Sequence, residues 1–270
     1  MGGAESDEQL IPEPETIYER TKEEGRRRLS RPFAEEASTA LAAGFDIVVG
    51  IVVMGLLIHF TERQFGREVA HVIGALGFGV AFIFLIVGRG ELFTENFLVP
   101  LAGLDHDDDN SNWANLAKLW LTSPVFNIIG GLILILIVTT HSVLPFGTGK
   151  ALLTVAETTH ANGKLALFMS AIFAGALITA MTWFIEGQAT MLPRIVIAWI
   201  VGFILALGQL NHVIVITLEL IFGYRYGASY DWTFIATNFF IAAAGNIVGG
   251  IGLVTLNRFT QGKAGRTASA

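Results

Sequence analysis

GRGELFTEN, at residues 88–96, is a polar, glycine-rich stretch that interrupts an apolar run from about Val69 to Leu104. GQLNH, at residues 208–212, interrupts a second long run, from about Pro193 to Phe222, in the same way. A helix needs roughly 20 residues to cross a hydrocarbon core about 30 Å thick, so each run is too long for one straight crossing. Irregular backbone at membrane depth is tolerated only where it lines a cavity or packs inside protein. The sequence therefore predicts two broken helices whose gaps line a pore.

The composition also indicates a membrane protein. Of the 270 residues, 53% are hydrophobic and 15% are charged, and the mean hydropathy is +0.59. A soluble domain needs more polar surface than this composition provides. Charged residues gather before Ala37, which predicts a polar cytoplasmic arm at residues 1–36, a transmembrane pore domain at 37–259 and a disordered tail at 260–270. The chain has no cysteine, which excludes disulfides and cysteine-ligated metals.

Six membrane crossings are expected, two of them the broken runs. The other four crossings are expected at about Thr39–Phe60, Trp113–Thr140, Leu165–Ile185 and Trp232–Leu256. Lys and Arg near the ends of the crossings favour a topology with both termini in the cytoplasm. We therefore expect an integral protein of the cell (inner or plasma) membrane.

A short motif occurs twice and indicates an internal repeat. NIIGG at residues 127–131 and NIVGG at 246–250 begin 119 residues apart, in the third and sixth crossings. Three crossings per copy place the second copy upside down, which is typical of transport folds. Repeat one is expected at about 37–140 and repeat two at about 163–259. Because Thr94 precedes the first motif by 33 residues and His212 precedes the second by 34, the spacing makes these two residues quasi-equivalent.

The chain resembles the formate/nitrite transporter family over roughly Ala37 to Phe259. The resemblance rests on several motifs in the same order: ELFT at 91–94, Leu116-Ala117-Lys118 with Trp120 and Asn127, His212, and GNIVGG at 245–250. It implies an all-α, aquaporin-like fold and a homopentamer with one pore in each protomer. It also implies passage of small monovalent anions such as formate, nitrite, lactate or hydrosulfide.

The resemblance further implies which residues line the pore. The family's mobile loop is matched by Leu92-Phe93-Thr94 and its central histidine by His212, with Asn211 beside it. Its outer aromatic constriction is matched by Phe78, with Phe82 one turn further along the helix, while Leu205 stands where an aromatic residue is often found. The chain departs from the family pattern at Ile216, where an asparagine is common, and at Arg89, where small residues are usual.

Other polar residues are expected to brace the breaks. Arg89 and Glu91 are interpreted as an ion pair that holds the first loop, with attraction of anions by Arg89 as the alternative. Asn127 and Asn246 are expected to hydrogen-bond the broken loops, while their neighbouring glycines permit close helix contact. The acidic run at 105–109 is interpreted as a solvated loop and not as a metal site.

A channel or channel-like transporter for small monovalent anions is the predicted function, without a cofactor, a metal or a nucleic-acid partner. The basic arm is expected either to contact anionic lipid or to form a helix at the pore. The sequence has no nucleophile–base pair, metal-ligand spacing or phosphate loop, which argues against an enzyme. Two alternatives stay open: a pore for neutral solutes such as water or glycerol, whose Asn-Pro-Ala signature is absent, and a proton-coupled anion symporter.

Overall fold

The protein is all-helical in the residues that the computed structural model describes, 12–104 and 111–269. The acidic run at 105–109 lies outside these residues. Along the chain the elements are α1 (Pro14–Leu29), α2 (Phe33–Phe65), α3 (Arg67–Gly88), the 3₁₀ turn η1 (Phe93–Phe97), α4 (Val99–Gly103), α5 (Ser111–Val138), α6 (Thr148–His160), α7 (Lys164–Glu186), α8 (Met191–Leu207), α9 (Val213–Arg225), α10 (Trp232–Ile247), the π-helix η2 (Val248–Thr255) and α11 (Leu256–Ser269).

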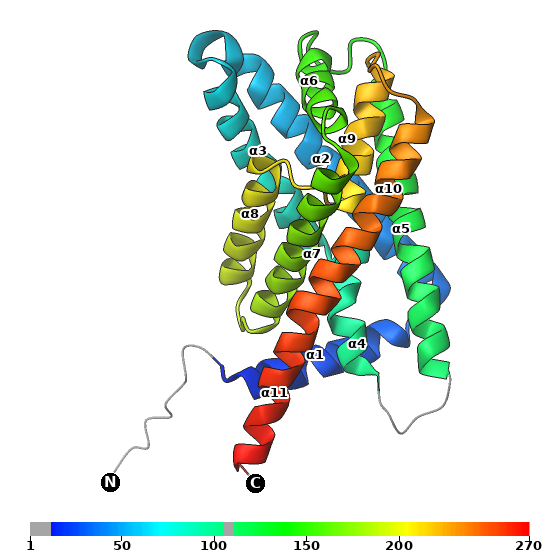
Figure 1. The fold of residues 1–270 in the computed structure, drawn as a ribbon, viewed down its shortest axis with the longest axis vertical. Coiled ribbons are helices and arrows are strands. Elements are labelled where there is room, and N and C mark those ends of the chain that lie inside the picture. Colours follow the sequence, from blue (N-terminus) through cyan, green and yellow to red (C-terminus); the bar gives the residue numbers. More distant parts are fainter. Residues whose placement is uncertain (1–11, 105–110, 270) are drawn as a thin grey trace.

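Five helical stretches are long and apolar enough to cross a membrane within the described residues: α2, α3, α5, α7 and the continuous stretch Trp232–Ala264. Each of the two long apolar runs is broken at the polar stretch where the sequence predicted an interruption. Helix α3 ends at Gly88 and helical structure resumes at Phe93, while α8 ends at Leu207 and α9 begins at Val213. In Figure 1, α3 runs downward to the first break, and α8 runs upward to the second break.

Helix α1 lies across one end of the bundle, beside α4 and α11 (Figure 1). Its apolar residues Ile17, Tyr18 and Leu29 are buried, so residues expected to form a polar arm include a packed helix. The contact with α4 is close, because a Cβ on Gly25 or Gly103 would overlap backbone of the other helix. The residues from 260, expected as a disordered tail, continue α11 as helix to Ser269.

The two copies of the short motif make the same kind of helix crossing. A Cβ on Gly130 of α5 would overlap the carbonyl oxygen of Leu41 in α2. In the second copy, a Cβ on Gly249 of η2 would overlap the carbonyl oxygen of Ile172 in α7. Small residues at such crossings let helix backbones approach closely in a membrane, which is the role expected of these glycines.

Gly249→Val is therefore expected to destabilise the protein by about 1–3 kcal/mol or more, because the added side chain forces η2 and α7 apart. Gly252→Val is the matched control, since it lies in the same π-helix with nothing within 4 Å of an added Cβ. The melting temperature of the detergent-solubilised protein measures both effects. Equal melting temperatures for the two variants would contradict the close crossing.

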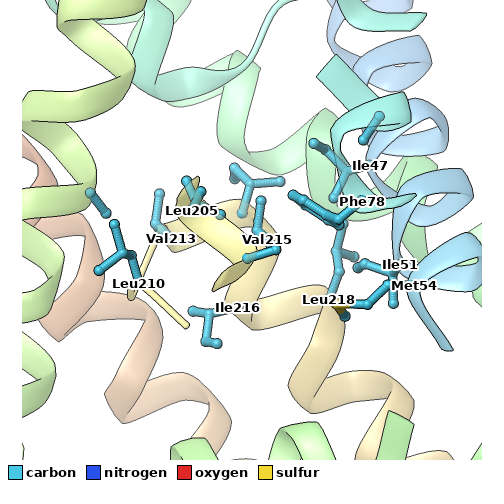
Figure 2. Packing of buried hydrophobic residues seen from close by; sticks show 14 of the residues in the cluster. Ile47, Ile51, Met54, Phe78, Leu205, Leu210, Val213, Val215, Ile216 and Leu218 are labelled. Carbon is cyan, nitrogen blue, oxygen red and sulfur yellow. The ribbon is translucent and has the colours of Figure 1, made fainter. Parts of the chain in front are cut away.

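One large cluster of buried apolar side chains fills the interior of the bundle. Figure 2 shows part of it, in which Phe78 of α3 and Leu205 of α8 lie near Val213 and Val215, at the beginning of α9. Two of the side chains expected along the pore, Phe78 and Leu205, are thus buried near the second helix break.

Candidate functional site

Both breaks begin with the same backbone turn. Arg89 and Gln209 follow the ends of α3 and α8 with positive φ angles of 56° and 45°. The next amides bond back into the preceding turn, from Gly90 N to Leu85 O at 2.9 Å and from Leu210 N to Leu205 O at 3.0 Å. This left-handed ending satisfies carbonyl groups that a terminated helix leaves free. The two breaks are therefore related by a shift of 120 residues, from Arg89 to Gln209.

Asn127 fastens the first break to two other helices. Its Oδ1 accepts a hydrogen bond from Phe93 N at 3.0 Å, and its Nδ2 donates to Glu91 O at 3.0 Å and to Ala40 O at 2.7 Å. Its side chain is fully buried. The amide supplies both a donor and an acceptor to backbone that has left helical pairing, so it connects the first break to α2 and α5.

Asn246 makes the same three contacts at the second break. Its Oδ1 accepts from Val213 N at 2.9 Å, and its Nδ2 donates to Asn211 O at 3.1 Å and to Ala171 O at 2.7 Å. Phe93 thus corresponds to Val213, and Leu92 corresponds to His212. The equivalence of Thr94 and His212 expected from spacing is wrong by two residues.

Thr94 and His212 are instead direct partners. The Thr94 Oγ1 lies 2.6 Å from the His212 Nε2, and both side chains are fully buried. His212 is also the N-cap of α9, where its Nδ1 accepts a hydrogen bond from Val215 N at 3.3 Å. A neutral ring has one donor and one acceptor nitrogen, so the proton sits on Nε2 and is donated to Thr94. No other described residue bonds the Thr94 hydroxyl, whose hydrogen is left for another acceptor.

Five apolar residues that were expected to line the pore belong to the large buried cluster. This cluster also contains Val213, which follows His212 in the chain. Phe78 and Phe82 contact each other edge to face at 6.1 Å between ring centroids, and Phe93 contacts Phe97 at 4.9 Å. Leu92 and Leu205 are buried with them. Apolar side chains at a constriction exclude water and bulky solutes, which is the property these residues would give a path through the breaks.

Asn211 was expected along the pore, but its side chain is directed at neighbouring helices. Its Nδ2 donates to Leu167 O of α7 at 3.0 Å and to Asn238 Oδ1 of α10 at 3.0 Å, and Asn238 returns a bond at 3.1 Å. All of the hydrogens of its amide are thus directed at neighbouring helices, so the side chain braces the second break. Asn238 was missed by the sequence analysis, although an asparagine within an apolar helix is a signal for such a bond.

The expected ion pair between Arg89 and Glu91 does not form. The Glu91 Oε1 instead lies 2.7 Å from Arg31 Nη2 and 3.2 Å from Arg28 Nε. Arg28 also donates to Asn96 Oδ1 at 3.0 Å. Glu91 therefore ties the first break to the N-terminal residues, whereas Arg89 is exposed and makes no ion pair with a described residue.

Glu24 extends this ionic network along α1. It contacts Arg27 at 2.6 Å and Arg28 at 3.1 Å. Burial by itself raises the pKa of this carboxyl group, but the two arginines outweigh burial and lower its pKa to about 2. The folded-state pKa is depressed, so this stabilisation is present above pH 4.5 and is lost only as the pH falls toward 2. Arg28 and Arg31 were missed by the sequence analysis, because nothing in the sequence pairs them with Glu91.

A cavity of about 630 Å³ lies between α1 and the ends of α3, α7 and α8. Its wall includes Arg28, Arg89, Glu91 and Arg194. A smaller cavity of about 50 Å³ is lined by Gln209, the counterpart of Arg89, together with His71. Each break therefore borders a hollow, and the buried Thr94–His212 pair joins the two breaks.

Comparison with known proteins identifies the family to which this chain belongs. The family model described as "Formate/nitrite transporter" matches residues 15–260. The inner membrane protein YfdC of Escherichia coli (strain K12) is 26% identical over 264 residues, which cover 95% of this chain and 82% of the relative.

Two solved structures share the fold. A pentameric formate channel with formate bound has a TM-score of 0.71 and 17% identity, over 84% of this chain and 96% of that one. An FNT family ion channel has a TM-score of 0.74 and 19% identity, over 91% of this chain and 98% of that one.

Proposed function

Because the chain belongs to the formate/nitrite transporter family, we propose that it is a membrane channel for small monovalent anions whose path passes the Thr94–His212 pair. The observation that carries this proposal is the 2.6 Å contact between a hydroxyl group from one break and an imidazole from the other. An ionisable side chain within the membrane-spanning part of a protein is by default a candidate for a solute or ion path, and His212 is such a side chain.

The pair offers one hydrogen-bond donor to a passing anion. His212 donates its Nε2 proton to the Thr94 oxygen, so the Thr94 hydroxyl hydrogen points to another acceptor, and an anion oxygen would serve. Helix α9 begins at Val213, directly after His212, and the partial positive charge of a helix N-terminus favours an anion there. These two contributions offset part of the hydration that the anion loses between the apolar side chains.

The proposed architecture is a 3+3 inverted repeat with six crossings, in which α3 with η1 and α4 forms one broken crossing and α8 with α9 forms the other. The matched contacts of Asn127 and Asn246 support this arrangement. We also propose a homopentamer with both termini in the cytoplasm. The structural similarity to a channel described as pentameric supports the assembly, and native mass spectrometry of the purified protein tests it.

Flux into proteoliposomes tests the function. Formate, nitrite, lactate and hydrosulfide are each offered across a pH series, with glycerol and water as neutral solutes and protein-free liposomes as the control. Anion entry without a pH gradient is the expected result. Entry that depends strictly on the gradient would identify a proton-coupled symporter instead. Passage of glycerol without passage of any anion would overturn the proposal.

A further inference from the structure

A third cavity, of about 310 Å³, lies next to the cavity of about 630 Å³, with which it shares Arg27 and Arg89. It is a partly open hollow between the end of α1, the beginning of α2 and the end of α3. Three arginines and one glutamate line it, together with two hydroxyl side chains: Arg27, Arg31, Arg89, Glu35, Ser38 and Thr39. The charged side chains of its wall therefore carry a net positive charge.

Two of the arginines have unused hydrogen-bonding capacity. Arg89 makes no ion pair or side-chain hydrogen bond with a described residue, although its position is fixed by the left-handed turn that ends α3. Arg31 is 7% exposed, and its Nε and Nη1 have no hydrogen-bond acceptor in the described residues. Buried polar atoms without partners are uncommon in folded proteins. The Arg31 Nε faces the Glu35 carboxylate at 3.4 Å, so it is the Nη1 that indicates a missing acceptor near this cavity.

The remaining groups fit a tetrahedral anion. The Thr39 hydroxyl has no hydrogen-bond partner among the described residues, so it can donate to an oxygen in the cavity. Arg27 already contacts Glu24 at 2.6 Å, and the Arg31 Nε lies 3.4 Å from an exposed Glu35 carboxylate. Arg31 also pairs with Glu91 at 2.7 Å, so among these three arginines only Arg89 has no carboxylate partner in the described residues. Guanidinium groups bind phosphate oxygens in bidentate fashion, and Arg89 is available for such a contact.

The two long helices that line the cavity carry exposed apolar side chains near the ends that reach it. Phe84 and Val87, in the last two turns of α3, are 47% and 54% exposed. Phe33, at the first position of α2, is 56% exposed. Helix α1 lies across one end of the bundle, and α2 is a candidate membrane crossing that begins there (Figure 1), so the cavity lies at the end of the bundle where α2 begins. A basic pocket between crossings, bordered by apolar side chains, suits a lipid head group with its chains alongside.

We propose that this cavity binds the phosphate of an anionic phospholipid, with Arg89, Arg31 and the Thr39 hydroxyl as its ligands. The acyl chains lie against the exposed apolar side chains of α3. The site adjoins the larger cavity beside the breaks, because Arg89 lines both, whereas Thr39 and Arg31 line only the smaller one.

Native mass spectrometry of the intact assembly tests the proposal, with phosphatidylglycerol and phosphatidylcholine titrated separately. One basic residue near a membrane surface contributes about 1 kcal/mol of attraction to anionic lipid. Arg89→Gln is therefore expected to weaken phosphatidylglycerol binding about fivefold and to leave phosphatidylcholine binding unchanged. Arg20→Gln is the matched control, because Arg20 lines the larger cavity but not this one.

Thr39→Val supplies an independent variant that keeps every charge and changes side-chain volume little. Loss of one hydrogen bond to a charged group is expected to weaken phosphatidylglycerol binding about tenfold. An equal affinity of the wild-type protein for the two lipids would overturn the proposal, as would equal phosphatidylglycerol affinities of Arg89→Gln and Arg20→Gln. Arg89-dependent binding of inorganic phosphate without a preference for phosphatidylglycerol would assign the site to a soluble anion and overturn the lipid proposal.

Discussion

Thr94→Val is expected to reduce formate flux about 10- to 100-fold, because a hydrogen bond to a charged group contributes about 1.5–3 kcal/mol. Valine has nearly the shape of threonine but cannot donate to an anion or accept from His212. Thr94→Ser keeps the hydroxyl group and is expected to retain most of the flux. Stopped-flow measurement of formate entry into proteoliposomes compares the three proteins at equal protein-to-lipid ratio.

His212→Asn separates the pore role of the histidine from its structural role. Asparagine is a preferred N-cap, so it can replace the bond from Val215 N that His212 now accepts at 3.3 Å. It is too short to span the same distance to Thr94. We expect a melting temperature close to that of the wild type and a flux as low as that of Thr94→Val. Wild-type flux in either variant, in a correctly assembled protein, would remove the pair from the anion path.

The breaks themselves were predictable, because a glycine and polar side chains within an apolar run have few physical explanations. Helix α3 ends at Gly88, and α8 ends at Leu207, directly before Gly208, where the sequence placed the interruptions. The bracing by Asn127 and Asn246 was also accessible, since each asparagine lies inside an apolar segment and requires partners. These predictions needed only local sequence and the properties of the bilayer.

The details of pairing were not predictable, because they depend on where distant segments meet. Counting back from the two motifs aligned Thr94 with His212, yet the hydrogen bonds align Leu92 with His212. The number of residues between each break and its motif does not reveal a displacement of two residues, because the loop backbone is irregular. The partners of Glu91 were missed for the same reason, since Arg28 and Arg31 are about 60 residues away in the chain. Helix α6 was also missed, because Thr148–His160 lies between crossings and is too short to read as one.

Glu91→Gln is the second change with a large expected effect. Glu91 is 6% exposed and faces two arginines that are themselves 9% and 7% exposed. Removing one partner of a buried ion pair leaves the other charge uncompensated, which costs about 3–5 kcal/mol. We expect a large fall in melting temperature, together with faster tryptic cleavage within α1, because the charged groups that hold α1 to the first break have lost their shared acceptor.

Glu35→Gln provides the matched control for that change, because Glu35 contacts the same Arg31, at 3.4 Å, from a side chain that is 53% exposed. An exposed pair contributes about 0–1 kcal/mol, so this variant is expected to melt near the wild type and to keep α1 protected from trypsin. The comparison changes one carboxylate to an amide in each case and differs mainly in burial. If both variants melted alike, Glu91 would not be holding the N-terminal helix, and the close contact of Gly25 with Gly103 would have to position α1 without help from charge.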